Sequence, residues 1–427
     1  MAESGRELAE QIYRAAVAGA DPAVRVGRAL DPGQYTGQRT FLTGLGKAAR
    51  AMTSAALEII GDGRSGAEAR PTLVVDGESG DHPVPGLRSE RAADALGAFL
   101  SRIHPNDRVL VLLSGGTSSL IAAPVDGISR DDLTRLFELL LRSGLDIHQA
   151  NLVRKRFCRW GAGRLAERIA GATVRVLAIS DVSGDRLESI GSGPCVPDPA
   201  RAEDVIAVLQ EAKLWLRVPA SVRSVLEDTR LGGRSETPKP GDPAFARVTH
   251  TVIANNTTAL DAAEVEAGRL GLTALRLRHP DDEQSPEISG EARAAGQAIA
   301  RATRGLRASS CLLFGGETTV TLSDASGQGG RCQELALAAA LELEELGLND
   351  ITLLAAGTDG RDGPTDAAGA VVDGNTAQLI RAAGIDPVRC LQQHDAYPAL
   401  DAVGGLLRIG PTGTNVRDVV VAIRTAG

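Results

Sequence analysis

The stretch RTFLTGLGKAA, residues 39–49, carries the clearest strand–turn–helix pattern of the chain. Its first five residues are typical of a buried strand, and an alanine-rich helical stretch follows the glycines. The turn matches the relaxed dinucleotide-binding pattern G-x-G-x-x-A, in which Gly44 and Gly46 would let backbone N–H groups approach a phosphate. Lys47 stands inside the turn, where its compact ammonium would point at that phosphate. The alternative is a tight turn that carries a solvated lysine.

The same alternation recurs along the first half of the chain. Short runs of Val, Ile and Leu, each followed by a turn containing Gly, Asp or Ser, alternate with Ala-rich stretches of helical period. This pattern predicts an α/β fold with a Rossmann-like, mostly parallel sheet covered by helices on both faces. Because such sheets bind ligands at the carboxyl ends of their strands, the turns there are the first candidates for chemistry. The expected strands are 39–43, 72–75, 108–113 and 174–179.

A second domain is expected after the segment 231–243, where Gly and Pro are densest. We therefore predict a first domain at 1–236 and a second at 237–427. The second is also α/β, with a mixed sheet, because Gly315, Gly316 and Glu317 are expected to join two strands as an antiparallel hairpin. The expected strands of this domain are 250–254, 272–277, 311–314, 318–322, 351–355 and 419–423.

Charge and composition exclude several classes of function. The chain has 46 Lys and Arg against 54 Asp and Glu, a net charge of −8, and 3% aromatic residues. Neither nucleic acid nor a membrane is an expected partner, and no apolar run is long enough to span a bilayer. The 5 cysteines are scattered without a C-x-x-C pair, which indicates reduced thiols in a cytoplasmic protein and no structural zinc. A homodimer is compatible with these properties.

Two further turns of the first domain suit anion binding and proton transfer. The run SGGTS, residues 114–118, follows a buried strand, and its N–H and hydroxyl groups can form an anion-binding concavity. A close-packed turn is the alternative. Asp181 comes soon after strand 174–179, a position that suits a proton acceptor as well as an ordinary helix N-cap. The candidate phosphate contacts here are Ser114, Gly115, Gly116, Thr117 and Ser118.

Two further basic residues of the first domain, Lys155 and His82, have two interpretations each. Lys155 belongs to the run RKR, residues 154–156, which reads first as a helix face and second as a contact for a substrate anion. His82 precedes a proline, and a turn residue is the first interpretation of it, before a ligand or a base. We keep Lys155 as a candidate substrate contact.

The second domain contributes another cation and an acidic loop. In GQGGRCQE, residues 327–334, Arg331 enters a helix at its N-terminus, which the helix dipole disfavours unless an anion is bound there. Gly329, Gly330 and Gln333 are the neighbouring candidate contacts. The loop GTDGRDGPTD, residues 357–366, offers carboxylates to Mg²⁺, and a solvated acidic loop is the alternative.

These motifs, in this order, resemble the class II glycerate 2-kinases from Leu8 to Val421. The chain departs from the family pattern at Cys332, where asparagine is usual, and at Thr117, where glycine is usual. The resemblance implies a Rossmann-like first domain, a MOFRL-like second domain and an active site in the cleft between them. The motifs are TGLGKA, HPVP, LSGGTS, NLVRK, SDVSGD, GSGP, GGETTV, GGRCQE, GTDGRDGPTDAAGA and GPTGTNV.

The resemblance also implies ATP- and Mg²⁺-dependent phosphorylation of D-glycerate at its 2-hydroxyl, giving 2-phosphoglycerate. The family's active-site lysine and arginine fall on Lys47 and Arg331, which would neutralise charge on the transferred phosphoryl group. Asp181 would orient or deprotonate the attacking hydroxyl. The candidate Mg²⁺ ligands are Glu317, Asp359 and Asp362.

Two other functions remain open on the sequence. A hydroxypyruvate reductase would bind a nicotinamide cofactor at the G-x-G-x-x-A turn. It ranks second because no acidic residue stands at a strand end about 20 residues later to bind the ribose. A non-catalytic sugar-acid-binding protein would keep the carboxylate site without the acids that hold magnesium, and those acids are present.

Overall fold

The computed structural model describes residues 4–36, 39–61, 70–277, 287–322 and 327–425, which form two compact units. The N-terminal unit is Pro22–Ile253, and the C-terminal unit is Ala254–Gly427 together with Met1–Asp21. This division differs from the expected boundary at residue 236. The Gly- and Pro-rich segment stays in the N-terminal unit, where Asp198 N donates to Pro238 O at 2.8 Å and Asp198 Oδ2 accepts from Thr237 Oγ1 at 3.0 Å.

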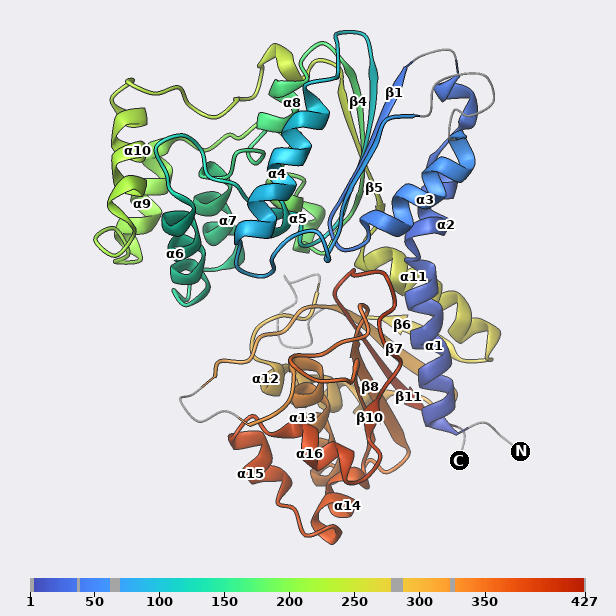
Figure 1. Cartoon of the computed structure of the whole chain (residues 1–427). Helices are drawn as coiled ribbons and strands as arrows, with labels where there is room; N and C mark the ends of the chain where they lie inside the picture. The colour runs from blue at the N-terminus through green and yellow to red at the C-terminus, as the bar shows by residue number, and fades with distance from the viewer. Residues whose placement is uncertain (1–3, 37–38, 62–69, 278–286, 323–326, 426–427) are drawn as a thin grey trace. The chain divides into compact units, whose positions relative to one another are not determined.

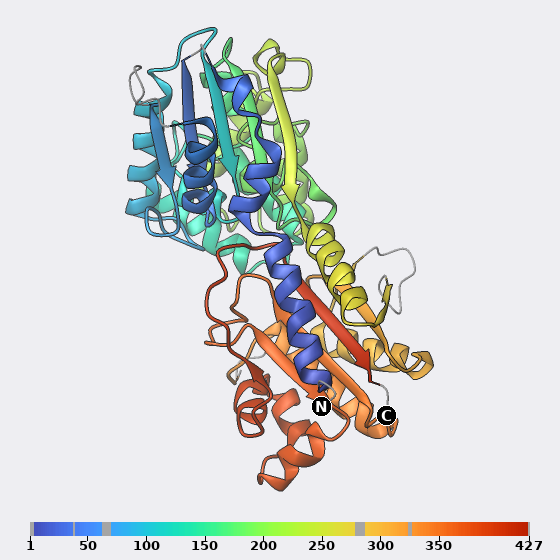
Figure 2. The same ribbon diagram turned by 90° about the vertical axis from the view of Figure 1, so that its right-hand side faces the viewer.

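The N-terminal unit is built on a five-stranded sheet in the order β2-β1-β3-β4-β5. The pairs β1–β2, β1–β3 and β3–β4 are parallel, and the arrows of the sheet point the same way in Figure 2. This confirms the predicted α/β class. Residues 250–254, expected in the second sheet, belong to β5 of this one. The strands are β1 (Thr40–Leu45), β2 (Thr72–Val75), β3 (Arg108–Leu113), β4 (Thr173–Ile179) and β5 (Val248–Ala254).

The strand order defines where a ligand would bind in this unit. It is the 2-1-3-4-5 order of doubly wound sheets, in which the chain leaves β1 toward β2 and returns on the other side to β3. The switch point therefore lies between the carboxyl ends of β1 and β3. Those ends carry two of the turns singled out in the sequence, 46–48 and 114–116.

Helices cover both faces of this sheet, with α2 and α3 on one side and α4, α5 and α8 on the other (Figure 1). Four more helices, α6, α7, α9 and α10, share a separate apolar core that includes Leu136, Phe137, Val205 and Leu226. Asp146 caps α7 by accepting from Gln149 N at 2.8 Å. The helices are α2 (Pro22–Ala29), α3 (Ala49–Ile60), α4 (Leu87–Leu100), α5 (Thr117–Leu120), α6 (Arg130–Leu141), α7 (Ile147–Arg156), α8 (Arg164–Arg168), α9 (Ala202–Glu211) and α10 (Ala220–Arg230), with short 3₁₀ turns at Pro32–Tyr35, Ser183–Asp185, Ile190–Ser192 and Pro243–Phe245.

The C-terminal unit has a six-stranded sheet in the order β10-β9-β8-β11-β7-β6. Its pairs are antiparallel except β6–β7, so the predicted mixed sheet is confirmed. The expected hairpin is wrong: residues 318–322 form no strand, and only Thr319 bridges to Glu291. β11, from the end of the chain, pairs with β7 instead. The strands are β6 (Thr273–Arg276), β7 (Ser310–Gly316), β8 (Ile351–Gly357), β9 (Gly369–Asp373), β10 (Leu406–Leu407) and β11 (Asp418–Arg424).

The first helix of the chain, α1 (Gly5–Gly19), packs on this second sheet together with α11 (Figure 1). Its buried face includes Ile12 and Tyr13, and Tyr13 Oη donates to Gly357 O at 2.6 Å. Helices α12 and α13 cover the opposite face. No described helix is both long and apolar enough to cross a membrane. The remaining helices are α11 (Asn256–Arg269), α12 (Ala292–Ala302), α13 (Arg331–Glu345), α14 (Thr376–Ala382), α15 (Pro387–Gln392) and α16 (Ala396–Asp401), with a 3₁₀ turn at Thr303–Gly305.

Candidate active site

The turns after β1 and β3 are bonded to each other at the switch point. Lys47 N donates to Gly115 O at 2.9 Å, and Ala48 N donates to Ser114 Oγ at 3.0 Å. Gly46 has a φ of +114°, and a Cβ there would lie 2.4 Å from Ser114 O. A Cβ on Gly44 would lie 2.3 Å from Thr53 Oγ1. Both glycines therefore serve close packing, and the N–H groups of 46–48 already have protein partners, which argues against the predicted phosphate contacts at Gly44 and Gly46.

Three side chains with acid–base chemistry lie around Gly115 and Gly116, and a fourth interacts with them electrostatically. A Cβ on Gly115 would lie 2.1 Å from Asp181 Oδ2, so the carboxylate lies directly over this residue. A Cβ on Gly116 would touch Lys47 Cγ at 3.3 Å and His82 Cδ2 at 3.5 Å. The positive charge of Arg154, from α7, acts on His82, and the carboxylate of Asp181 acts on Arg154. We call Lys47, His82, Arg154 and Asp181 the Lys47 cluster.

The charges of the Lys47 cluster influence one another. Desolvation first, and then the positive charges of Lys47 and Arg154, lower the pKa of His82 to about 4, so its imidazole is neutral at pH 7. Burial also lowers the pKa of Arg154, while Cys158 and Asp181 act in the opposite direction. The ammonium side chain of Lys47 is exposed. The cluster therefore holds two cations, one carboxylate and one neutral imidazole at the carboxyl edge of the sheet.

The other predicted contacts of this unit are held by the protein itself. Thr117 is buried, and its Oγ1 donates to Ser114 O at 2.8 Å. Ser118 Oγ accepts from Ser192 Oγ at 2.7 Å, which ties this turn to the 3₁₀ turn at 190–192. Lys155 is 6% exposed, and its Nζ lies 2.8 Å from Asp198 Oδ1. Lys155 therefore has a structural role in a buried ion pair in place of the predicted substrate contact.

In the C-terminal unit, Arg331 is held by two carboxylates. Its Nε and Nη2 donate to Asp418 at 2.6 and 2.8 Å, and its Nη1 lies 2.6 Å from Glu317 Oε1. Burial works against the charge of Arg331, but Asp418 and Glu317 raise its pKa above the ordinary value. The guanidinium is 35% exposed. We call Arg331, Glu317 and Asp418 the Arg331 cluster.

The acidic loop after β8 caps the helix that begins at Arg331. Asp362 is buried and accepts from Cys332 N at 3.1 Å and Gln333 N at 2.8 Å. A Cβ on Gly330 would lie 2.4 Å from the same carboxylate. The side chain of Gln333 donates to Thr365 Oγ1 at 2.9 Å. The buried Oε1 of Gln333 has no partner among the described residues. Cys332, the departure from the family pattern, thus contributes its backbone N–H to this cap.

Gly329 lies in the same close-packed turn. Its carbonyl oxygen is 2.3 Å from the position of a Cβ on Gly363, a residue with a φ of +61°. A Cβ on Gly329 itself would make only an ordinary contact, at 3.5 Å from Ala396 N. Gly329 and Gly330 therefore allow the acidic loop to approach the start of α13.

The three expected Mg²⁺ ligands do not form a metal site as a set. Glu317 is paired with Arg331, and the carboxylate of Asp362 accepts two backbone N–H groups. Asp359 Oδ1 accepts from Arg361 N at 3.1 Å. In the described part of the chain, no group of three His, Cys, Asp or Glu side chains is placed to hold a metal ion. We therefore derive no catalytic step through a protein-bound metal.

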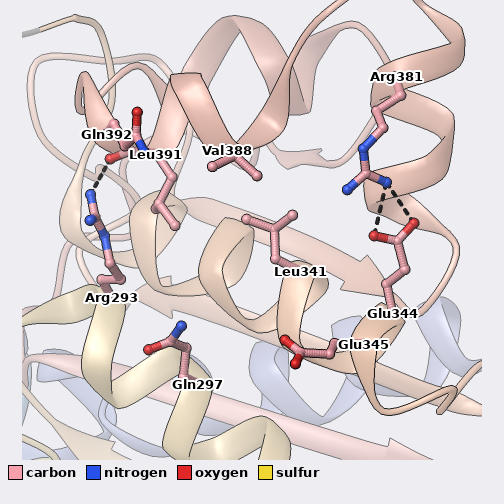
Figure 3. Close-up of a pocket in the computed structure, with 9 residues that line it drawn as sticks. All are labelled: Arg293, Gln297, Leu341, Glu344, Glu345, Arg381, Val388, Leu391 and Gln392. Carbon is pink, nitrogen blue, oxygen red and sulfur yellow. Dashed lines mark hydrogen bonds and ion pairs between the residues drawn. The ribbon is translucent and has the colours of Figure 1, made fainter.

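A hollow of about 430 Å³ opens in the C-terminal unit among α12, α13, α14 and α15 (Figure 3). Its two arginines already have partners: Arg381 Nη1 lies 2.6 Å from Glu344 Oε1, and Arg293 donates to Leu391 O. None of the residues that the sequence singled out lines this hollow. We assign the chemistry to the charged clusters and not to the hollow.

Sequence reasoning missed three residues of these clusters. In the sequence, the proline after His82 favours a turn residue, and the basic run 154–156 favours a helix face for Arg154. Asp418 was not singled out, although an acidic residue at the start of the apolar run DVVVAI is a usable signal. The fold explains its place, because Asp418 pairs with Gly316 and Gly357 and so lies between the ends of β7 and β8.

A doubly wound sheet with charged side chains at its switch point defines a ligand-binding α/β protein, and comparisons with known proteins narrow this class. Residues 8–227 match the family described as "Domain of unknown function (DUF4147)", and residues 310–418 match the MOFRL family. The chain belongs to the glycerate 2-kinase family, in which these two domains are combined.

Of three similar proteins, two are named glycerate kinases and support this assignment, and the third has a different name. A glycerate 2-kinase of Pyrococcus horikoshii is 41% identical over 403 residues, which cover 91% of this chain and 88% of that one. The crystal structure of a glycerate kinase from Thermotoga maritima has a TM-score of 0.81 at 36% identity, covering 98% of this chain and 99% of that chain. An Agrobacterium vitis protein named putative hydroxypyruvate reductase is 37% identical over 432 residues, 97% of this chain and 94% of that one.

Proposed function

We propose that this protein is a kinase that transfers the γ-phosphoryl group of ATP to the 2-hydroxyl of D-glycerate, giving 2-phosphoglycerate and ADP. The observation that carries the proposal is the Lys47 cluster, with two cations around one carboxylate at the switch point. Such a site attracts an anionic substrate and offers a base to its hydroxyl. Similarity to glycerate kinases along nearly the whole chain supports the choice of substrate.

Within the N-terminal unit, each side chain of the Lys47 cluster that contacts Gly115 or Gly116 has its own role in the proposed reaction. Asp181 accepts the proton of the attacking hydroxyl, because its carboxylate lies over Gly115 beside the Lys47 side chain. The ammonium of Lys47 neutralises charge on the phosphoryl group as it moves. His82 is neutral near pH 7 and adds no competing positive charge.

The C-terminal unit supplies Arg331. Two hydrogen bonds to Asp418 fix the plane of its guanidinium. The directions of its other N–H groups are therefore also fixed. We propose that both clusters serve one phosphoryl transfer, which requires closure of the two units around the substrates. Mg²⁺ that accompanies ATP would supply neutralisation of charge on the phosphates.

One coupled assay tests the proposal. The protein is incubated with ATP, Mg²⁺ and D-glycerate, and enolase is added to convert any 2-phosphoglycerate to phosphoenolpyruvate. We expect phosphoenolpyruvate to appear, and we expect Lys47→Ala to abolish most of it while Lys213→Ala, an exposed lysine, does not. Detection of 3-phosphoglycerate in place of the enolase substrate would contradict the proposed position of transfer, and ADP with neither phosphoglycerate would indicate ATP hydrolysis and contradict the proposed kinase activity.

The same preparation tests the second candidate from the sequence, a hydroxypyruvate reductase, which is also the activity named for the Agrobacterium vitis relative. A hydroxypyruvate reductase would oxidise NADH or NADPH when given hydroxypyruvate, with no need for ATP. The packed Gly44–Gly46 turn, whose amides have protein partners, argues against a dinucleotide there. A protein that binds D-glycerate but turns over neither substrate would be the non-catalytic alternative.

A further inference from the structure

Three buried polar atoms on one side of α7 have no hydrogen-bond partner among the described residues. They are His148 Nδ1, Asn151 Oδ1 and Arg154 Nε. Residues three apart are neighbours on a helix surface, so the three side chains follow one face of α7. Buried polar atoms in native proteins are nearly always paired. Their concentration on one face points to a partner outside the described residues, and a bound ligand would be such a partner.

Asn151 and Arg154 are the two that can recognise a small anion with hydroxyl groups. Asn151 is only 4% exposed, yet its side-chain carbonyl oxygen has no hydrogen-bond partner in the described part of the chain. Arg154 belongs to the Lys47 cluster, and the cluster carries an excess of positive charge, with Lys47 and Arg154 against Asp181. A ligand with one negative charge would balance it.

The next residue along the helix shows why Arg154 and not Lys155 is the candidate. Lys155 is buried against Asp198, with Nζ and Oδ1 2.8 Å apart, and its charge is already neutralised. Arg154 lies on a different side of the helix, where its Cζ is 6.0 Å from the centre of the Phe137 ring. An arginine also presents two parallel N–H donors, which match the two oxygens of a carboxylate.

We propose that Arg154 binds the carboxylate of D-glycerate and that Asn151 Oδ1 accepts a hydrogen bond from a hydroxyl group of the same molecule. This inference rests on the proposed function and names the groups that select its substrate. It also explains the position of transfer. The 2-hydroxyl is on the carbon next to the carboxylate, so an acid anchored at Arg154 presents that hydroxyl, and not the 3-hydroxyl, to nearby Asp181.

The test compares Arg154→Gln with Arg142→Gln, an exposed arginine just after α6. Steady-state rates are measured with D-glycerate and with D-glyceramide, the neutral amide of the same acid. Because a hydrogen-bonded charge pair is lost, we expect Arg154→Gln to raise the KM for D-glycerate about 30-fold or more, with the KM for ATP unchanged. The kcat/KM for D-glyceramide should be the same in wild type and variant, and Arg142→Gln should match wild type throughout.

A readout that does not depend on phosphoryl transfer separates this inference from the proposed function. D-glycerate is titrated into the protein without nucleotide, and the heat of binding is measured. Binding by wild type that disappears in Arg154→Gln supports the inference even if no phosphoglycerate is ever formed, in which case only the proposed reaction fails. Production of 2-phosphoglycerate with an unchanged KM and unchanged binding in Arg154→Gln overturns the inference and leaves the reaction standing.

The same rates also show whether Arg154→Gln damages the fold. If Arg154→Gln merely disturbs the packing of α7, both D-glycerate and D-glyceramide will lose kcat/KM equally, which also overturns the inference. If the glutamine variant does not fold, Arg154→Lys decides the question. Lysine keeps the positive charge but lacks the two parallel N–H donors of arginine. We therefore expect an intermediate rise in the KM for D-glycerate and no rise in the KM for D-glyceramide.

Discussion

Single residues in this protein show how neighbours in sequence acquire different roles. Lys155 is buried in an ion pair, while Arg154 beside it belongs to the Lys47 cluster and has an Nε with no partner among the described residues. The run RKR could be recognised in the sequence as basic, but the two sides of α7 could not be told apart without knowing what packs on them. The sequence singles out Lys47 and Arg331 because each is a cation that follows glycines close to the start of a helix.

Asp362 gives a prediction on the dependence of stability on pH. Burial raises its pKa to about 7, above the value near 3.9 of an unfolded chain. The folded state therefore holds the proton more tightly, and this contribution to stability is lost as the pH rises from about 4 through 7. Between pH 5 and pH 8 the free energy of unfolding of the C-terminal unit should fall by about 2 kcal/mol through this group.

Asp362→Asn removes the titrating group and keeps an oxygen for the start of α13. Thermal unfolding of both proteins is followed from pH 5 to pH 8, and the slopes are compared, since the lost hydrogen bond shifts the variant at every pH. We expect the wild type to lose stability relative to the variant as the pH rises. Parallel curves would show that Asp362 stays ionised across this range.

At the scale of elements, the strand–turn–helix at 40–60 agrees in outline with the sequence prediction, and the close packing of its glycines favours the alternative of a tight turn. The glycines of the G-x-G pattern predicted a phosphate contact, because the pattern does not reveal which atoms approach a missing Cβ. In the structure those atoms are Ser114 and Thr53. Similarly, the alternation of residues predicted most strands but could not assign 250–254 to a sheet, since sheet membership depends on contacts distant in sequence.

Gly46→Ala tests this packing role. The added methyl would meet Ser114 O at 2.4 Å on a backbone with φ +114°, so the N-terminal unit should lose about 2–4 kcal/mol of stability. The matched control is Gly144→Ala, which has a φ of +72° and nothing within 4 Å of the added methyl. It should lose only the backbone strain, about 1–2 kcal/mol. Equal losses in chemical unfolding would show that close contact with Ser114 is unimportant.

Elements that the sequence missed were short or depended on a partner. β10 is the edge strand and β9 lies next to it. With 2 and 5 residues, they are too short to show a clear alternation of apolar and polar residues. The hairpin at 312–322 was predicted from glycines between two apolar runs. β11 takes the place next to β7 that the hairpin strand would need, and Thr319 is left bridging to Glu291.

At the scale of the whole molecule, the proposed mechanism makes residues of two units act on one phosphoryl group. Lys47→Ala and Arg331→Ala should each lower kcat on the order of 10³-fold, by analogy with the loss of a transition-state arginine. Groups that act as a unit are strongly non-additive. The double variant should therefore lose far less than the product of the two single losses.

The kinetics of the four proteins in this cycle are measured with saturating ATP and D-glycerate. Lys213→Ala and Arg307→Ala, both exposed, control for the loss of positive charge in each unit. Losses that simply multiply would mean that Lys47 and Arg331 contribute independently, and the shared-site mechanism would have to be abandoned.

The path of the chain has a consequence for biosynthesis. α1 leaves the ribosome before the whole N-terminal unit, yet the surface that covers Ile12 and Tyr13 includes β11, and Thr414 donates to Ala20 O across 394 residues. At ordinary translation speeds of roughly 5–20 residues per second, the apolar face of α1 stays uncovered for about 20–80 s until β11 has been synthesised. The nascent protein thus has a long interval in which chaperone capture or aggregation competes with the last step of folding.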